Sequence, residues 1–376
     1  MIYLNQAATS YPKPQCVLDA HAVALRDLPG FQFRSATNLS NQDVEGCCQK
    51  AMGQILGVQD SHRIFFTSGA THSANAVLAG LLASKKRVVT TATEHNAILR
   101  PLYNMERFKD SKIDIVPCDK NGYVDPKKLE SYLSDDVGLL IVNHCSNVTG
   151  MIQEMEQIGA LAHEQGIIFA ADVSQSAGCI PIKGDEWHAD ILIFTGHKSL
   201  LGVQGIGGYY IREGMKLIPF MFGGTGKDSA KLHYEMAEYE YIVGTQNGPG
   251  TTALTAGANY VLATGIEAIS NYERTLISQL YQGLKSLPHV TVYGDEKTNK
   301  GPVASFNVKG LDPSDVAYIL QNSEGIIVRA GLHCAPLIHE YIESGIKGTI
   351  RASVSTFNTT ADIQALIKAL AKLQGV

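Results

Sequence analysis

The stretch "ADILIFTGHKSLLG" (residues 189–202) decides the fold class of this chain. Its first half carries the continuous apolar run "ILIF", which is typical of a strand buried on both faces of a sheet. Its second half places Lys198 just after that strand, between Gly196 and Gly202. A lysine in a loop after a strand is usually solvated. The rest of the sequence therefore has to indicate whether Lys198 has a chemical role.

Similar apolar runs lie on both sides of this stretch and are separated by segments of helical length, such as residues 154–165. Alternation of buried strands and helices predicts an α/β fold with a largely parallel sheet covered on both faces. The predicted strands fall at residues 63–66, 87–91, 112–117, 138–144, 166–173 and 189–196. One more strand is expected at residues 205–213, as an antiparallel edge.

The pattern changes after about residue 250. Residues 251–286 predict one long helical stretch, which we expect two units of the protein to share. Shorter strands and helices follow and indicate a smaller α+β unit, with strands near 290–293, 302–308 and 326–329 and helices at 312–321 and 360–373. We therefore predict a large domain of residues 15–258 and a small domain made of residues 1–14 and 259–376.

Composition excludes several classes of protein. The 376 residues are 45% hydrophobic and 18% charged, with a net charge of −5 and no long basic run, so no nucleic-acid partner is expected. The apolar runs are too short to span a membrane, and the N-terminus lacks a secretory pattern, so a cytoplasmic protein is expected. Seven cysteines without a CxxC pair predict neither a disulfide framework nor a metal site.

Polar, glycine-punctuated turns follow the predicted strands. In open α/β sheets, ligands bind outside the carboxyl ends of the strands, so these turns together predict a site. They are "TSGAT" (67–71), "TEHNA" (93–97), "CSNVTG" (145–150), "DVSQSAG" (172–178) and "TGHKS" (195–199). The turns match neither the phosphate-binding P-loop nor the dinucleotide-binding glycine fingerprint.

Residue types in these turns suit pyridoxal phosphate. Lys198 in a desolvated site would form a Schiff base, and Asp172 at a strand end would pair with a protonated pyridine nitrogen. His95 would stack on a flat ring, and Thr71 would help to bind a phosphate at a helix N-terminus. Each residue also has a plain structural alternative: Asp172 caps its own turn, Thr71 caps a helix, and His95 faces solvent.

The chain resembles the class V aminotransferases of pyridoxal-phosphate fold type I, and within them the cysteine desulfurases and selenocysteine lyases. The resemblance implies a large domain with a mostly parallel seven-stranded sheet and a smaller α+β domain. It rests on "NQAATSYPKP" (5–14), "TSGAT" (67–71), "TEHNA" (93–97), "SNVTG" (146–150), "ADVSQSAG" (171–178), "TGHKSLLG" (195–202), "GTQN" (244–247), "RAGLHCAP" (329–336) and "RASVSTFNT" (351–359).

The resemblance implies pyridoxal 5'-phosphate as cofactor, with Lys198 bound to its aldehyde. It also implies that Asp172 pairs with the ring nitrogen, Gln175 with the ring hydroxyl, and that His95 stacks on the ring and helps to move protons. The remaining cofactor contacts that it implies are Asn147 beside the ring, Ala70, Thr71, Thr195 and His197 on the phosphate, and Thr245 on the phosphate of a neighbouring subunit. This last contact implies a homodimer.

By the same resemblance, the substrate is L-cysteine or L-selenocysteine. Arg351 would clamp its carboxylate with a rigid fork beside Asn147, and Cys334 would take the sulfur as a persulfide and leave L-alanine. Arg329 and His333 would favour the Cys334 thiolate. The loop around Cys334 is short, which implies a sulfur-acceptor protein that comes to the persulfide. The alternative is a buried, structural Cys334.

Two stretches depart from the family pattern. The family commonly has an aspartate near Asn5 or Gln6, and Arg34 and Asn38 stand in a segment that often carries a histidine. These departures leave the choice of substrate and acceptor open. The alternatives to a cysteine desulfurase are a selenocysteine lyase, another class V transamination or β-elimination, and a non-catalytic binding partner. The sequence does not decide among iron–sulfur cluster assembly, tRNA thiolation and selenium metabolism.

Overall fold

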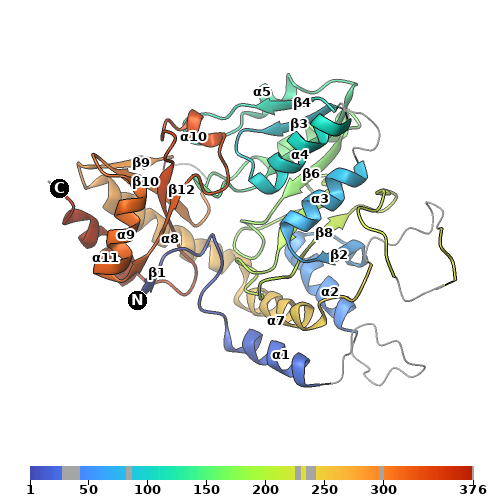
Figure 1. The fold of residues 1–376 in the computed structure, drawn as a ribbon, viewed down its shortest axis with the longest axis horizontal. Helices are drawn as coiled ribbons and strands as arrows, with labels where there is room; N and C mark the ends of the chain where they lie inside the picture. Colours follow the sequence, from blue (N-terminus) through green and yellow to red (C-terminus); the bar gives the residue numbers. More distant parts are fainter. Residues whose placement is uncertain are drawn as a thin grey trace.

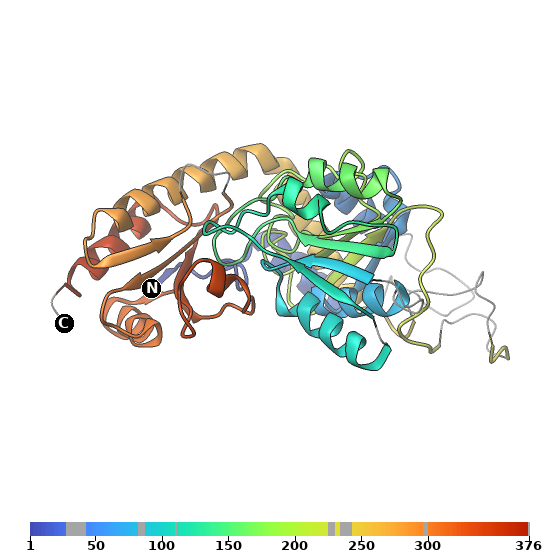
Figure 2. The same cartoon turned by 90° about the horizontal axis from the view of Figure 1, so that it is seen from above.

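A computed structural model describes residues 1–27, 43–81, 87–109, 111–224, 230–233, 243–295 and 300–374. Arg34 and Asn38 lie outside these residues. The chain forms a larger body around one sheet and a smaller body beside it, which contains the C-terminal part and the first strand (Figure 1). Seen from above, the smaller body lies at one end of the molecule (Figure 2). No helix within the described ranges is long and apolar enough to span a membrane.

The large body contains the predicted sheet of seven strands, in the order β2-β8-β7-β6-β5-β3-β4. The strands are β2 (Ile64–Thr67), β3 (Arg87–Thr91), β4 (Ile113–Val116), β5 (Val137–Asn143), β6 (Ile168–Asp172), β7 (Ile191–Thr195) and β8 (Gly207–Ile211). β8 runs antiparallel to both of its neighbours, and the pairs among β3 to β7 are parallel. The fold class and the mostly parallel sheet are confirmed.

The position predicted for β8 at an edge is wrong, because β8 lies between β2 and β7. The apolar pattern predicts that a strand is buried, but it does not predict which strands pair with it or which strand forms the edge of the sheet. Its two glycines suit a crowded interior position. A Cβ atom at Gly208 would lie 2.5 Å from the carbonyl oxygen of Phe65.

Helices cover both faces of this sheet. This agrees with the continuous apolar runs of the strands, because successive side chains of a strand point to opposite faces. Val88, Leu139 and Ile141 face α3 (Ala70–Leu81) and α4 (Asn96–Lys109). The adjacent residues of the same strands point to the other face, which is covered by α2 (Val44–Leu56), α6 (Met155–Glu164) and α7 (Gly248–Thr264). Because both faces are buried, a slip of one residue in register would exchange the two cores.

Two more helices belong to the large body. α1 (Gln15–Arg26) packs against α7, and α5 (Pro126–Glu130) starts at a proline after Asp125. The Asp125 side chain accepts a hydrogen bond from the Lys127 backbone amide, which caps the first turn of α5.

The small body is built on an antiparallel sheet of order β12-β13-β10-β9, with a separate parallel pair of β1 and β11. The strands are β1 (Ile2–Tyr3), β9 (Val290–Tyr293), β10 (Val303–Val308), β11 (Ile326–Ile327), β12 (Arg329–Gly331) and β13 (Thr349–Ser353). The helices are α8 (Ile266–Lys285), α9 (Pro313–Glu324), α10 (Ile338–Tyr341) and α11 (Thr360–Ala371). The predicted α+β character of this part is therefore present.

The prediction of a single long helix over residues 251–286 is wrong. Gly265, with a φ of 88°, separates α7 from α8. Leu254 of α7 packs into the core of the large body, whereas Leu276 and Leu280 of α8 pack into the core of the small one. A break at a glycine lets each helix follow its own core. The domain division after residue 258 falls within α7 and stays a prediction.

Candidate active site

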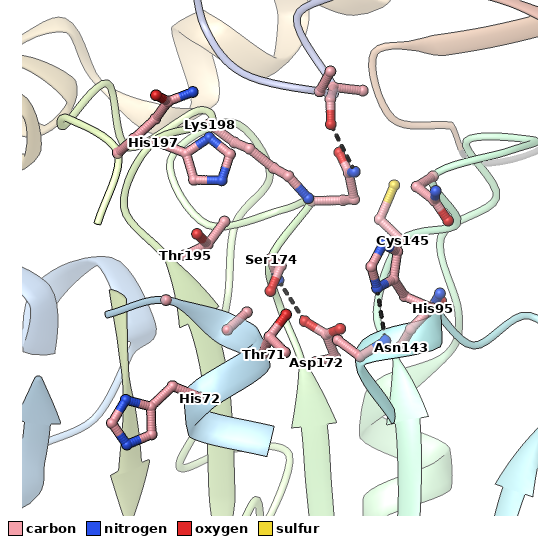
Figure 3. Close-up of a pocket in the computed structure, with 18 of the residues that line it drawn as sticks. Thr71, His72, His95, Asn143, Cys145, Asp172, Ser174, Thr195, His197 and Lys198 are labelled. Carbon is pink, nitrogen blue, oxygen red and sulfur yellow. Dashed lines mark hydrogen bonds between the residues drawn. The ribbon is translucent and has the colours of Figure 1, made fainter. Parts of the chain in front are cut away.

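A cavity of about 380 Å³ lies at the carboxyl ends of the central strands of the large sheet. Residues of the small body line its other side. This volume is within the range of ligand sites, roughly 300–1,000 Å³. Figure 3 shows Asp172, Ser174, Thr195 and Lys198 around one space, with His95 at its side. The cavity wall contains most of the predicted site residues, namely Ala70, Thr71, His95, Asn147, Asp172, Gln175, Thr195, His197, Lys198, Arg329 and Arg351.

Asp172 and Lys198 come from neighbouring parallel strands. Asp172 is the last residue of β6 and is 7% exposed, and Lys198 follows the end of β7. One oxygen of Asp172, Oδ1, accepts a hydrogen bond from the Ser174 amide at 2.9 Å. Within the described part of the chain, no donor reaches the other oxygen. The turn-capping alternative is thus correct for Oδ1, while Oδ2 remains available to a ligand.

The amine of Lys198 is poised to lose its charge. Burial, together with the positive charges of Arg351 and Arg329, lowers the pKa of Lys198 to about 8, while Asp172 opposes the shift. A larger fraction of neutral amine is therefore present near neutral pH than in an ordinary lysine. A neutral amine is the form that attacks an aldehyde.

His95 lies at the start of α4 as a neutral imidazole. Its Nδ1 accepts a hydrogen bond from the Ala97 amide at 2.9 Å, so its proton lies on Nε2. Burial lowers the pKa of His95 to about 3, with a further contribution from the charge of Lys198. A neutral ring suits stacking on a flat aromatic ligand, and its Nε2–H group remains free to donate a hydrogen bond.

The turn before α3 lies at the end of the cavity where we predicted a phosphate. Gly69 has a φ of 145°, a conformation that favours glycine, and α3 begins at the next residue. The first backbone amides of α3 point out of the helix and suit a phosphate. Thr195 and His197 lie on the same wall. Burial lowers the pKa of His197 to about 4, so its ring is neutral.

The N-terminal segment, which belongs to the motif at residues 5–14, also contributes to the site, through residues that were not among the predicted site residues. Ala7 lines the cavity, and the Gln175 amide donates to the Ala7 carbonyl at 3.1 Å. The carbonyl oxygen of His197 accepts bonds from the Ser10 amide at 3.0 Å and from Lys13 Nζ at 2.9 Å. These contacts join residues far apart in the sequence, and no local pattern signals them.

Arg351 is a fully buried cation without an acidic partner among the described residues. Its Nη1 donates to the Asn147 carbonyl at 3.0 Å, and its Nη2 donates to Asn5 Oδ1 at 3.2 Å. Its Nε has no partner in the described structure. Burial lowers the pKa of Arg351 to about 9, and the charge of Arg329 adds to this shift. Two positive side chains on one wall make the site suitable for a carboxylate.

Cys334 is half-buried in the short loop between β12 and α10 and is not part of the cavity wall. Its sulfur accepts a bond from Arg329 Nη2 at 3.3 Å, and its carbonyl accepts one from the Asn96 amide at 2.6 Å. His333 and Cys334 have φ values of 51° and 61°, so the loop makes a sharp turn.

His333 does not supply the positive charge that we expected beside Cys334. Its Nε2 contacts Thr349, and burial lowers the pKa of His333 to about 2. Its ring is therefore neutral, and of the two expected cations only Arg329 acts on the Cys334 sulfur.

Thr245 lies outside the main cavity, in a second hollow. This hollow also contains Thr251 and Asn247, and it shares Ser68, His72 and Gly205 with the main cavity. Within one chain, Thr245 therefore does not line the main cavity, and its contact with a neighbouring subunit stays a prediction.

The residues present fit pyridoxal phosphate. Several buried polar atoms on the wall have no partner among the described residues, and buried polar groups rarely remain unpaired. They are Asn147 Oδ1, Ser174 Oγ, His197 Nδ1 and Arg351 Nε. An amine, a carboxylate and a helix N-terminus around one cavity match an aldehyde, a pyridine nitrogen and a phosphate.

Comparison with known proteins agrees with this geometry. The family model "Aminotransferase class-V" matches residues 2–366. A probable cysteine desulfurase of Methanothermobacter thermautotrophicus is 31% identical, with 100% of this chain and 95% of the relative covered. The apo structure of a cysteine desulfurase from Thermococcus onnurineus NA1 has 30% identity and a TM-score of 0.88, with 99% of this chain and 94% of that chain covered. A cysteine desulfurase structure from Escherichia coli has 25% identity and a TM-score of 0.86, with 98% and 94% covered. The chain therefore belongs to the class V aminotransferase family.

Proposed function

We propose that this chain is a cysteine desulfurase that uses pyridoxal 5'-phosphate to convert L-cysteine to L-alanine, with the sulfur held on Cys334 as a persulfide. The family and the similar proteins support this activity. One observation carries the role of Cys334: its sulfur lies 3.3 Å from Arg329 Nη2, and Arg329 belongs to the wall that also contains Lys198.

The cofactor would be held by side chains already in place. Lys198 would bind its aldehyde, Asp172 its ring nitrogen, and Gln175 its ring hydroxyl. Residues around the start of α3, with Thr195 and His197, would hold the phosphate. When bound, the cofactor supplies an electron sink for the α-carbon of the substrate. His95, neutral and with its proton on Nε2, would stack on the ring and donate a hydrogen bond from that atom. A proton that His95 takes up would go to Nδ1, in place of the bond from the Ala97 amide.

The sulfur transfer balances without an external oxidant. The Cys334 thiolate attacks the sulfur of the substrate, so that an S–S bond forms while the bond from sulfur to the β-carbon breaks. The electron pair of the broken bond goes to the β-carbon, which takes up a proton and becomes the methyl group of L-alanine. Arg329 would favour the attacking thiolate, and Arg351 would hold the substrate carboxylate.

A β-elimination that does not need Cys334 is the second candidate. It is favoured by the position of Cys334 outside the cavity wall. In that reaction sulfide would leave directly, and pyruvate and ammonia would form in place of L-alanine. Both candidates use Lys198 and Asp172 in the same way.

The experiment that separates them compares Cys334→Ser with Cys16→Ser. Cys16 is exposed and does not line the cavity, so its variant is the control. With L-cysteine, the proposal predicts L-alanine, a mass increase of one sulfur atom on Cys334, and loss of both in Cys334→Ser only. L-Alanine formed at the normal rate by Cys334→Ser would reject the role of Cys334. Parallel rates on L-selenocysteine would rank the two substrates.

We also propose a homodimer in which Thr245 reaches the phosphate of the neighbouring subunit. Support comes from the second hollow, which shares lining residues with the main cavity near the predicted phosphate position. Within one chain, Thr245 lines this hollow but not the main cavity. A sulfur-acceptor protein and a cytoplasmic location remain part of the proposal. Light scattering of wild-type protein and of Thr245→Ala tests the dimer, because it measures the mass of the assembly. The cofactor content of both proteins tests the contact between Thr245 and the phosphate.

A further inference from the structure

The loop at residues 147–150, the Asn147 loop, is held by the small body at four successive carbonyl oxygens. The donors belong to β13, to β10 and to the segment just before β10. In the order of the carbonyls they are Arg351 Nη1 at 3.0 Å, Ser305 Oγ at 2.6 Å, Lys300 Nζ at 2.9 Å and the Gly301 amide at 2.7 Å. The backbone of Met151, the next residue, also bridges to Lys300. The position of this loop therefore depends on the small body.

Asn147 connects this attachment to the loop of Cys334. Its side chain lies on the cavity wall, and its Nδ2 donates a hydrogen bond to the carbonyl of His333, which is buried. The Cys334 carbonyl in turn accepts a bond from the Asn96 amide at the start of α4. The turn of Cys334 is thus held to the large body on both sides of its own backbone. One of these two contacts depends on the Asn147 loop.

Lys300 is a buried amine among the four donors. It is 6% exposed, and besides the Thr149 carbonyl its Nζ reaches the Tyr281 hydroxyl on α8 at 3.1 Å. The Tyr281 hydroxyl donates in turn to the Tyr293 carbonyl at the end of β9, at 3.0 Å. Burial lowers the pKa of Lys300 to about 8, and the charge of Asp295 opposes this shift. Burying an amine costs free energy that an apolar side chain would avoid, so these contacts indicate a role beyond packing.

The space around the Lys300 amine is closed by Gly294. A Cβ atom added at Gly294, which has a φ of 83°, would collide with Lys300 Nζ, so the amine would have to move. Gly310, in the same body, has a φ of 82°, but a Cβ atom added there would have no neighbour within 4 Å. Substitution at either glycine therefore brings a similar backbone strain, and only substitution at Gly294 displaces the amine.

We propose that Lys300 is a positioning residue for sulfur transfer, because it holds the Asn147 loop against the small body. Through that loop it fixes the turn of Cys334 beside the cofactor cavity. The side chains predicted to bind the aldehyde, ring nitrogen and phosphate of the cofactor lie on other loops of the large body. Loss of Lys300 should therefore slow sulfur transfer more than it weakens cofactor binding. The inference rests on the proposed function for the identity of this step.

The test compares Lys300→Met and Gly294→Ala with the control Gly310→Ala, each loaded with pyridoxal phosphate. The first variant removes the donor, the second displaces it, and the control adds backbone strain alone. With L-cysteine, we expect the first two variants to form L-alanine about tenfold more slowly than wild type, as expected for the loss of one hydrogen bond from a charged group. All three variants should bind the cofactor within about twofold of wild type, and Gly310→Ala should keep the wild-type rate.

Amide hydrogen exchange of the same loaded proteins gives a readout that does not depend on activity. It measures local opening, which rises where a segment loses its contacts. In Lys300→Met and Gly294→Ala, peptides that cover the Asn147 loop and the turn of Cys334 should exchange about tenfold faster than in wild type. Peptides that cover β6 and β7 should exchange as in wild type, and Gly310→Ala should show wild-type exchange in all four segments.

Three results would overturn the inference. They are wild-type exchange in both loops of Lys300→Met, equal effects of Gly294→Ala and Gly310→Ala, and a loss of cofactor in Lys300→Met as large as its loss of rate. The last result would show that Lys300 supports the fold as a whole. A wild-type protein that forms no L-alanine would instead reject the proposed function, and hydrogen exchange in the turn of Cys334 would still decide whether Lys300 positions it.

Discussion

Arg329 on β12 and Arg351 on β13 lie directly opposite each other, and neither forms an ion pair with a described residue. Together with Lys198 they place three cationic side chains on the cavity wall, where Asp172 is the carboxylate among the described lining residues. This excess of positive charge explains why the site suits an anionic cofactor and a substrate carboxylate. The two arginines have separate partners. Arg329 donates a hydrogen bond to the Cys334 sulfur, and Arg351 donates one to the Asn147 carbonyl.

Replacing Arg329 tests its effect on Cys334. Arg329→Met should slow alkylation of Cys334 by iodoacetamide at neutral pH by about tenfold, because the guanidinium beside the sulfur favours the thiolate. Arg329→Lys retains a charge and should lose less. Mass spectrometry of the modified peptides gives the rates, with exposed Cys16 in the same protein as the internal reference. Equal Cys334 rates in wild type and Arg329→Met would show that the contact has no such effect.

The pH dependence of cofactor uptake reports the state of Lys198. Because the neutral amine reacts and its pKa is lowered to about 8, the uptake rate should rise through that pH and level off above it. Asp172 raises the pKa of Lys198, so Asp172→Asn should move the midpoint to lower pH. Stopped-flow absorbance of the cofactor-free protein with added pyridoxal phosphate measures the midpoint. A midpoint near 10.5, the ordinary lysine value, would contradict the burial of this amine.

Ser305 joins the small body to the loop that carries Asn147. Its Oγ is fully buried and donates to the Val148 carbonyl at 2.6 Å. Ser305→Ala leaves that carbonyl without this donor and should lower the free energy of unfolding by about 1–3 kcal/mol. The control is Ser314→Ala at an exposed position on α9, where we expect a change within about 0.5 kcal/mol. Urea unfolding measures both, and equal stability of the two variants would reject the structural role of this bond.

Replacing Gly69 tests whether the turn before α3 holds the phosphate of the cofactor. Gly69→Ala should weaken pyridoxal phosphate binding, because a φ of 145° is strained by about 1–3 kcal/mol for a residue with a side chain. Gly214 has a φ of 81° in an exposed turn, and a Cβ atom added there would have no neighbour within 4 Å. Gly214→Ala therefore carries a similar backbone strain away from the cavity. Both variants should lose thermal stability, but only Gly69→Ala should lose cofactor affinity. Equal cofactor affinity in the two variants would exclude a role for the Gly69 turn.

The sequence predicted those parts of the molecule that depend on local patterns. Strands such as β6 and β7 are continuous apolar runs, and the ends of parallel strands meet at one edge, so Asp172 and Lys198 could be placed together. The interior position of β8 and the break at Gly265 depend on which elements pack beside them, which local patterns do not encode.

The missing parts of the site depend on long-range contacts. Asn5 and Arg351 are separated by 346 residues, and Lys13 and His197 by 184. The neutral state of His333 follows from its burial, which a motif that also contains Arg329 does not reveal. Sequence order brings His333 near Cys334, whereas packing turns its ring toward Thr349.

Covalent attachment of the cofactor at Lys198 is the central claim, and borohydride reduction tests it most directly. The protein is loaded with pyridoxal phosphate, reduced, digested and analysed by mass spectrometry. We predict one pyridoxyl modification, on Lys198, and its loss in Lys198→Ala, while the half-buried Lys13 nearby stays unmodified. A modification found mainly on another lysine, or none after saturating cofactor, would contradict the account.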